Sequence, residues 1–162
     1  MNNAATSPYY GRTLGIDPAR YDKTFDVNLR GPLFWSQAAW DAAFKERAGV
    51  IVNIASVAGL QVLPQIGVYC ISKAAVIQMT KAQALEWGRY GINVNALCPG
   101  YIRTEINDEH WDTAAGHKLM QMLPRKRIGR PEDLDGALLL MVADESQFIN
   151  GAVLTADDGL SV

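Results

Sequence analysis

Residues 50–55 read VIVNIA, a run in which Asn53 is the single polar residue. A strand with one face in water alternates apolar and polar side chains, whereas a strand covered on both faces of a parallel sheet is apolar almost throughout. The run therefore predicts a buried parallel strand. Two later runs, INVNALCPG at 92–100 and GAVLTADDG at 151–159, predict a second strand that ends at Pro99 and Gly100 and a last strand over 152–156.

Helical patterns separate these strands. Asp17 followed by Pro18 is typical of a helix start, and the apolar spacing predicts a helix over 18–45 with a bend at Gly31 and Pro32. The other predicted helical segments cover 67–90, 103–122 and 131–143, of which 103–122 is polar and expected to be mobile. Alternation of helices and strands indicates one α/β domain that spans the whole chain, residues 1–162.

Composition restricts the classes of function. The 162 residues are 49% hydrophobic and 20% charged, which is typical of a globular domain with a core. A net charge of -2 argues against nucleic-acid binding, and the basic cluster at 125–130 is interpreted as a solvated turn. The sequence shows neither a bilayer-spanning apolar run nor a secretory leader, so we expect a cytoplasmic protein without membrane contact. We expect Cys70 and Cys98 to be reduced and buried, and His110 and His117 to lie at the surface.

A tyrosine and a lysine stand four residues apart in GVYCISKAA, residues 67–75. On a helix, Tyr69 and Lys73 lie one turn apart on the same face. A phenol has an ordinary pKa of about 10, and a cation beside it in a partly dry cleft favours the phenolate. On its own, the pair more often has a structural role, in which the tyrosine packs and the lysine is solvated.

Polar and turn-forming residues follow the predicted strands. Ser56 comes directly after the first strand, Pro99 and Gly100 end the second, and Thr104 follows four residues later. In parallel α/β sheets, ligands bind outside the carboxyl ends of the strands. These residues and the helix that carries Tyr69 are therefore expected to face one crevice.

Together these segments resemble the short-chain dehydrogenase/reductase family over nearly the whole chain. The matching segments are NNAA at 2–5, DVNLRG at 26–31, NIAS at 53–56, YCISK at 69–73, NVNALCPGYIRT at 93–104, RIGRPEDL at 127–134 and INGAVLTADDG at 149–159. The resemblance implies the C-terminal part of a Rossmann-like, doubly wound parallel sheet, with the family's fifth to seventh strands and a stub of the fourth. Ala5 and Asp158 stand where the family has glycine.

The resemblance also implies hydride transfer between NAD or NADP and a carbonyl or secondary alcohol. Tyr69 would then donate or accept the proton, Lys73 would lower its pKa and hold the nicotinamide ribose, and Ser56 would bind the substrate oxygen. Asn28, at the helix bend, would hold a water molecule of a proton relay to Lys73. The residues implied on the cofactor side are Asn3, Ala4, Tyr69, Lys73, Pro99, Gly100, Ile102 and Thr104.

The glycine-rich phosphate turn that members of this family carry before the NNAA-type segment does not occur in these 162 residues. The stretch GRTLGID at 11–17 has Asp17 where a cradle needs glycine, and no apolar strand precedes it, so we interpret it as a turn that caps the next helix. The residues that distinguish NAD from NADP belong to the same missing region. Its absence would also leave strand 50–55 with an unpaired flank.

Three hypotheses follow. The chain is an oxidoreductase of this family, or a truncated and catalytically silent relative that acts only as an interaction or oligomerisation module, or a non-enzymatic binding domain. The last is disfavoured because Ser56, Tyr69, Lys73 and Asn28 occur together.

The expected partners are a small substrate and further copies of the chain. A small apolar carbonyl or alcohol is expected because the loops 59–66 and 102–123 contain Leu60, Val62, Leu63, Ile66, Trp111, Met120 and Met122. Homo-oligomers would form through helices 18–45 and 67–90, where Trp35, Trp40 and Trp87 serve either an interface or the core.

Overall fold

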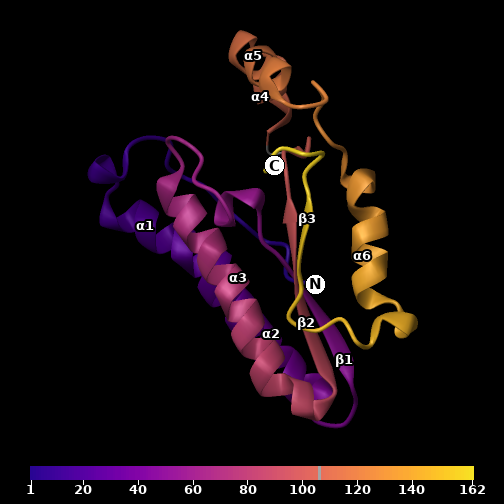
Figure 1. The fold of residues 1–162 in the computed structure, drawn as a ribbon. Coiled ribbons are helices and arrows are strands. Elements are labelled where there is room, and N and C mark those ends of the chain that lie inside the picture. Colours follow the sequence, from indigo (N-terminus) through magenta and orange to yellow (C-terminus); the bar gives the residue numbers. More distant parts are fainter. Residues whose placement is uncertain (106) are drawn as a thin grey trace.

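The structure of the protein is a computed structural model that describes residues 1–105 and 107–162. Three strands, β1 (Gly49–Ile54), β2 (Ile92–Pro99) and β3 (Val153–Ala156), pair in parallel in the order β1-β2-β3 (Figure 1). Each lies within about one residue of its predicted range. Because the strands are parallel and joined by helices, the predicted α/β class is confirmed.

Helices cover both faces of the sheet (Figure 1). One face carries α3 (Gly67–Trp87), with α1 (Pro18–Phe25) and α2 (Gly31–Ala39) beside it, and the other carries α6 (Asp135–Val142). The buried residues of β1 and β2 that contribute to the core under one helix or the other are Ile51, Val52, Ile92, Val94, Ala96, Leu97 and Cys98. This coverage explains why β1 is apolar almost throughout.

The segment 18–44 is one nearly continuous helix that contains two wider turns. Asp17 caps it by accepting a hydrogen bond from the amide of Arg20 at 2.9 Å. The turns at Asp26–Arg30 and Trp40–Phe44 are π-helical, so the irregularity begins before the predicted bend at Gly31. Pro32 has no N–H, so the carbonyl of Asn28 lacks its usual donor four residues on. The predicted helix 67–90 is α3 followed by a 3-10 turn at Gly88–Tyr90.

The N-terminal residues pair with the outer flank of β1. The amide of Asn2 donates to the carbonyl of Val52, and the amide of Ile54 donates to the carbonyl of Asn2, both at 2.9 Å. The Asn2 side chain also donates to Asn53 Oδ1 at 2.7 Å and to Ser36 Oγ at 3.0 Å. The expected strand stub is therefore present, and it pairs part of the flank that we expected to be unpaired.

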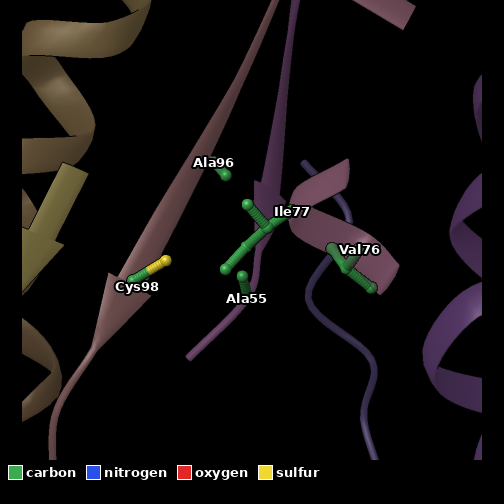
Figure 2. Packing of buried hydrophobic residues seen from close by; sticks show 5 residues of the cluster. All are labelled: Ala55, Val76, Ile77, Ala96 and Cys98. Carbon is green, nitrogen blue, oxygen red and sulfur yellow. The ribbon is translucent and has the colours of Figure 1, made fainter. Parts of the chain in front are cut away.

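Small side chains bring α3 close to the sheet. Figure 2 shows Ile77 of α3 between Ala96 and Ala55, with Cys98 on the neighbouring strand and Val76 nearby on the same helix. Both Cys98 and Cys70 are free thiols and buried, as predicted.

The three tryptophans named above differ in burial. Trp40 and Trp87 pack against the core that contains Ile51, whereas Trp35 is 72% exposed. Of these three, only Trp35 remains available for an interface.

The chain region 103–122 forms two short helices, α4 (Asp108–Trp111) and α5 (Ala114–Met122). Ile106 lies outside the described residues. No helix among the described residues has the length and apolar character that crossing a membrane requires.

Candidate active site

A cleft of about 570 Å³ opens at the carboxyl ends of β1 and β2. Most of the predicted site residues line it: Asn3, Ser56, Tyr69, Lys73, Pro99, Gly100, Ile102 and Thr104. They come from the N-terminal stub, the turn after β1, helix α3 and the loop after β2, so four separate segments meet here. Two predicted residues, Ala4 and Asn28, do not line the cleft.

Ser56 is held at the end of β1 by a local cap. Its extended backbone lets its Oγ accept a hydrogen bond from the amide of Ala58 at 3.1 Å, at the start of the 3-10 turn Val57–Gly59. Burial raises the pKa of Tyr69, and the Ser56 hydroxyl nearby partly opposes this effect. Both hydroxyl-bearing side chains line the same cleft.

Lys73 lies one turn after Tyr69 on α3 and is 2% exposed. Its Nζ donates to the carbonyl of Ile54, the last residue of β1, at 2.7 Å, and stands 5.7 Å from the centre of the Tyr69 ring. Burial lowers the pKa of Lys73 to about 8. Because the ammonium is bound to the strand and not to the phenol, the expected lowering of the Tyr69 pKa by Lys73 stays a prediction.

Asn28 is buried in the wider helical turn, and its side chain is committed to structure. Its Oδ1 accepts from the amide of Thr6 at 2.7 Å, while its Nδ2 donates to the Thr6 carbonyl and the Ser72 hydroxyl, each at 2.9 Å. Ser72 Oγ in turn donates to the carbonyl of Tyr69 at 2.7 Å. The side chain thus links the N-terminal stub to α3. The expected role of Asn28 in a water relay to Lys73 stays a prediction.

The loop after β2 approaches β3 so closely that only glycine fits. The amide of Gly100 donates to the carbonyl of Ala156 at 3.0 Å, and a Cβ at Gly100 would lie 2.8 Å from the Cα of Asp157. This contact brings Ile102 and Thr104 to the rim of the cleft.

The apolar wall of the cleft differs from the one predicted. Leu63 and Ile66 line it, whereas Leu60, Val62 and Met122 are largely exposed. Trp111 is buried with its ring edge-on to Tyr101 at 5.4 Å between ring centres. Tyr101 lines the cleft and was missed, although it directly follows the motif residues Pro99 and Gly100. The further lining residues, which the sequence did not assign to the site, are Met1, Ala5, Ile54, Ala55, Val57, Ala58, Leu97, Asn107, Pro131, Leu134, Asp135 and Leu138.

Several polar groups in the cleft could hold the nicotinamide and ribose of a dinucleotide. Lys73 uses one of its three N–H groups on Ile54, so two N–H groups have no acceptor among the described residues. Asn3 and Thr104 add an amide and a hydroxyl to the same cleft. These donors and acceptors suit a ribose diol and a carboxamide. The described residues include no glycine-rich turn for the phosphates.

The 3-10 turn after Ser56 rests directly on α3, which leads to a stability prediction. A Cβ at Gly59 would lie 2.7 Å from the carbonyl carbon of Lys73, a main-chain atom that cannot move aside cheaply. We expect Gly59→Ala to lower the free energy of unfolding by about 1–3 kcal/mol, as overpacking does elsewhere. Urea unfolding followed by circular dichroism measures this change.

Gly136→Ala is the matched control for that measurement. Gly136 lies inside α6, and a Cβ there would meet no atom within 4 Å. Replacement should therefore raise stability by about 0.5–1 kcal/mol through helix propensity. Equal stabilisation by both substitutions would show that the close contact at Gly59 does not lower the free energy of unfolding.

Comparisons with known proteins cover nearly the whole chain. The sequence profile of a family described as enoyl-(acyl carrier protein) reductase matches residues 1–161. An uncharacterized oxidoreductase of Thermotoga maritima is 35% identical over 98% of this chain and 65% of its own length. An NAD-dependent glycerol dehydrogenase of Listeria innocua is 36% identical over 88% of this chain and 56% of its own length.

A solved structure shares the fold. The gluconate 5-dehydrogenase of Burkholderia cenocepacia, in complex with NADP and tartrate, superposes with a TM-score of 0.92 at 34% identity. The superposition covers 99% of this chain and 63% of that protein. The chain thus spans less than two thirds of the length of these relatives.

Proposed function

The chain belongs to the short-chain dehydrogenase/reductase family, and from this premise we propose that its cleft is the nicotinamide and substrate end of an NAD(P)-dependent oxidoreductase site. The observation that supports the proposal most is the meeting of Ser56, Tyr69 and Lys73 in one cleft with Gly100, Ile102 and Thr104. The names of the relatives include both an NAD-dependent dehydrogenase and one solved with NADP, so either cofactor is compatible.

In the proposed reaction, the bound cofactor supplies or accepts the hydride. Tyr69 transfers a proton between its hydroxyl and the substrate oxygen, and it does so as an acid because burial keeps its pKa high. Ser56 donates its hydroxyl proton to the same oxygen, where negative charge grows during reduction. Lys73 holds the ribose through its two remaining N–H groups and places a positive charge beside the phenol.

The surroundings of Tyr69 favour an uncharged, largely apolar substrate. Among the described residues, the charged side chains that line the cleft are Lys73 and Asp135, and Lys73 has the role given above. No arginine lines the described part of the cleft, so a substrate carboxylate would have no bidentate partner there. Leu63, Ile66 and Tyr101 instead offer apolar area for the body of the substrate.

A catalytically silent interaction module is the second candidate. Exposed apolar side chains on the outer helices favour it: Phe34 and Trp35 on α2 are 56% and 72% exposed, and Leu85 on α3 is 86% exposed. Homo-oligomerisation through these helices would cover them. In this reading, the same chain forms a single structural domain without turnover.

Titration with NADH and with NADPH distinguishes the two functions. If the chain is an enzyme, we expect micromolar binding, measured by cofactor fluorescence. A dissociation constant near 1 μM corresponds to a binding free energy of about 8 kcal/mol. The Lys73→Met variant, which lacks the proposed ribose contact, should bind at least about tenfold more weakly. Millimolar or absent binding by the unmodified chain would support the silent module instead.

A further inference from the structure

Four charged side chains join the turn after β3 to the loop before α6. Asp158 is the centre of this cluster: Arg125 Nη1 lies 3.0 Å from its Oδ1, and Arg127 Nε lies 2.8 Å from its Oδ2. Arg127 also binds Asp133, with 3.1 Å between Nη1 and Oδ2. The basic cluster that we interpreted as a solvated turn is thus engaged with acidic partners.

Asp158 has a backbone conformation that most residues disfavour. Its φ is +58°, in the left-handed region where family members have glycine at this point of the sequence. Aspartate tolerates this region better than most residues, but glycine tolerates it without cost. The side chain is 27% exposed and engages both arginines. The aspartate carboxylate therefore forms two ion pairs that glycine could not form at this position.

The ion pairs lie beside a pocket. The residues after β3, such as Asp158 and Leu160, line this pocket of about 190 Å³ together with Leu123 and Pro124, and Tyr101 and Ile102 line it as well. The ion pairs of Asp158 therefore connect two segments that share the wall of one pocket.

The loop 125–130 is hydrogen-bonded to the rim of the cleft. The amide of Arg103 donates to the carbonyl of Gly129 at 2.8 Å, and the amide of Gly129 donates to the carbonyl of Tyr101 at 3.0 Å. Asp133 secures the same loop by accepting from the amide of Arg130 at 2.8 Å. A continuous set of contacts therefore runs from Asp158 to Ile102, which lines the cleft.

We propose that Asp158 is a positioning residue that holds the loop 125–130 and, through it, the Tyr101–Arg103 rim of the cleft. Its charge is available at neutral pH, because Arg127 and Arg125 hold the pKa of its carboxyl below the ordinary value. The relevance of the rim to a reaction rests on the proposed function. The mechanical link itself does not, and it can be tested without turnover.

Amide hydrogen exchange of the unmodified chain and of Asp158→Asn tests the link. Asparagine keeps the tolerance for positive φ and removes the charge. We expect the amides of Gly129 and Arg103 to exchange roughly three- to tenfold faster in the variant, as the loss of a small ion-pair network predicts. The amides of Val94 and Ala96 in β2 should not change.

Two controls separate positioning from a general loss of structure. Asp157 accepts hydrogen bonds from the amides of Gly159 and Ser161 in the same turn but pairs with neither arginine. Asp157→Asn should therefore leave exchange at Gly129 unchanged. In a variant that already carries Arg125→Gln and Arg127→Gln, the further substitution Asp158→Asn should not raise the exchange rates of Gly129 and Arg103.

Unchanged exchange at Gly129 and Arg103 in Asp158→Asn would overturn the proposal. So would an equal rise in Asp157→Asn, or a further rise in the background that lacks both arginines. Faster exchange at these amides in a chain that binds neither NADH nor NADPH would support the link while contradicting the proposed function. Cofactor binding by the unmodified chain, with unchanged exchange in Asp158→Asn, would support the proposed function and contradict the link.

Discussion

Replacement of Tyr69 by phenylalanine should lower kcat by a factor of about 10² to 10⁴, the usual contribution of a positioned general acid. The ring would still fill its place on α3, because phenylalanine lacks only the hydroxyl. Ser56 would still line the cleft and could bind the substrate oxygen, but the proposed proton donor would be gone. The measurement is the rate of NADH or NADPH oxidation with a carbonyl substrate under saturating conditions.

Cofactor affinity distinguishes a chemical effect of Tyr69→Phe from a structural one. The dissociation constant for the cofactor should change by less than about tenfold, since at most one hydrogen bond is lost. Tyr21→Phe is the matched control, because Tyr21 stacks on Phe25 in α1 and does not line the cleft. If Tyr69→Phe retains kcat within about threefold of the unmodified chain, Tyr69 is not the proton donor.

Replacement of Lys73 by methionine should change how stability depends on pH. Burial lowers the pKa of Lys73 from its ordinary value of 10.5 to about 8. Between these two pH values the unfolded chain holds the proton and the folded chain has lost it. The lysine's contribution to the free energy of unfolding therefore rises with pH across this window and is constant below pH 8, where both states are charged.

The lysine's contribution to the free energy of unfolding should change by about 3 kcal/mol across this window. The pKa of Lys73 differs by about 2.5 between the two states, and a pKa difference of one corresponds to about 1.36 kcal/mol. Cys98 acts in the opposite direction, because burial raises the pKa of its thiol from 9.0 to about 11 and so lowers stability across that range. Tyr69, whose pKa is also raised, acts in the same sense as Cys98. The comparison with Lys73→Met removes the contribution of Tyr69 but only part of that of Cys98, because the Lys73 ammonium itself lowers the pKa of that thiol.

Methionine removes a buried charge, so Lys73→Met is expected to be the more stable protein near pH 7. This advantage should shrink by about 3 kcal/mol as the pH rises from 8 to 10.5. Urea unfolding at a series of pH values measures both proteins. Lys81→Met removes an exposed ammonium from the same helix and serves as the control. A stability difference that is the same at every pH would contradict a buried, shifted Lys73.

The strands and the meeting of the site residues could be predicted from the sequence for a physical reason. A strand covered on both faces must be apolar, so 50–55 could be recognised without its neighbours. Residues four apart on a helix must share a face, which placed Tyr69 and Lys73 together. The carboxyl ends of parallel strands lie at one edge of a sheet, and this brought Ser56, Gly100 and Thr104 to the same cleft.

Features that depend on side-chain direction could not be predicted in the same way. The sequence places Asn28 at a bend, but only the folded chain shows its amide turned to Thr6 and Ser72. Likewise, Leu63 and Leu60 have similar chemistry three residues apart, and the local turn decides which of them lines the cleft. Asp158 could be recognised as a departure from the family pattern, but its arginine partners lie 31 and 33 residues away.

The side chain of Asn28 has a consequence for how this protein can vary. It binds both the N–H and the C=O of Thr6, much as a neighbouring strand would, while Asn2 is fixed to β1 four residues earlier. The span between the two anchorages therefore has a set length. An insertion or deletion there would release one anchorage or displace Asn3 from the cleft, so homologues should tolerate substitutions in this span more readily than changes in its length.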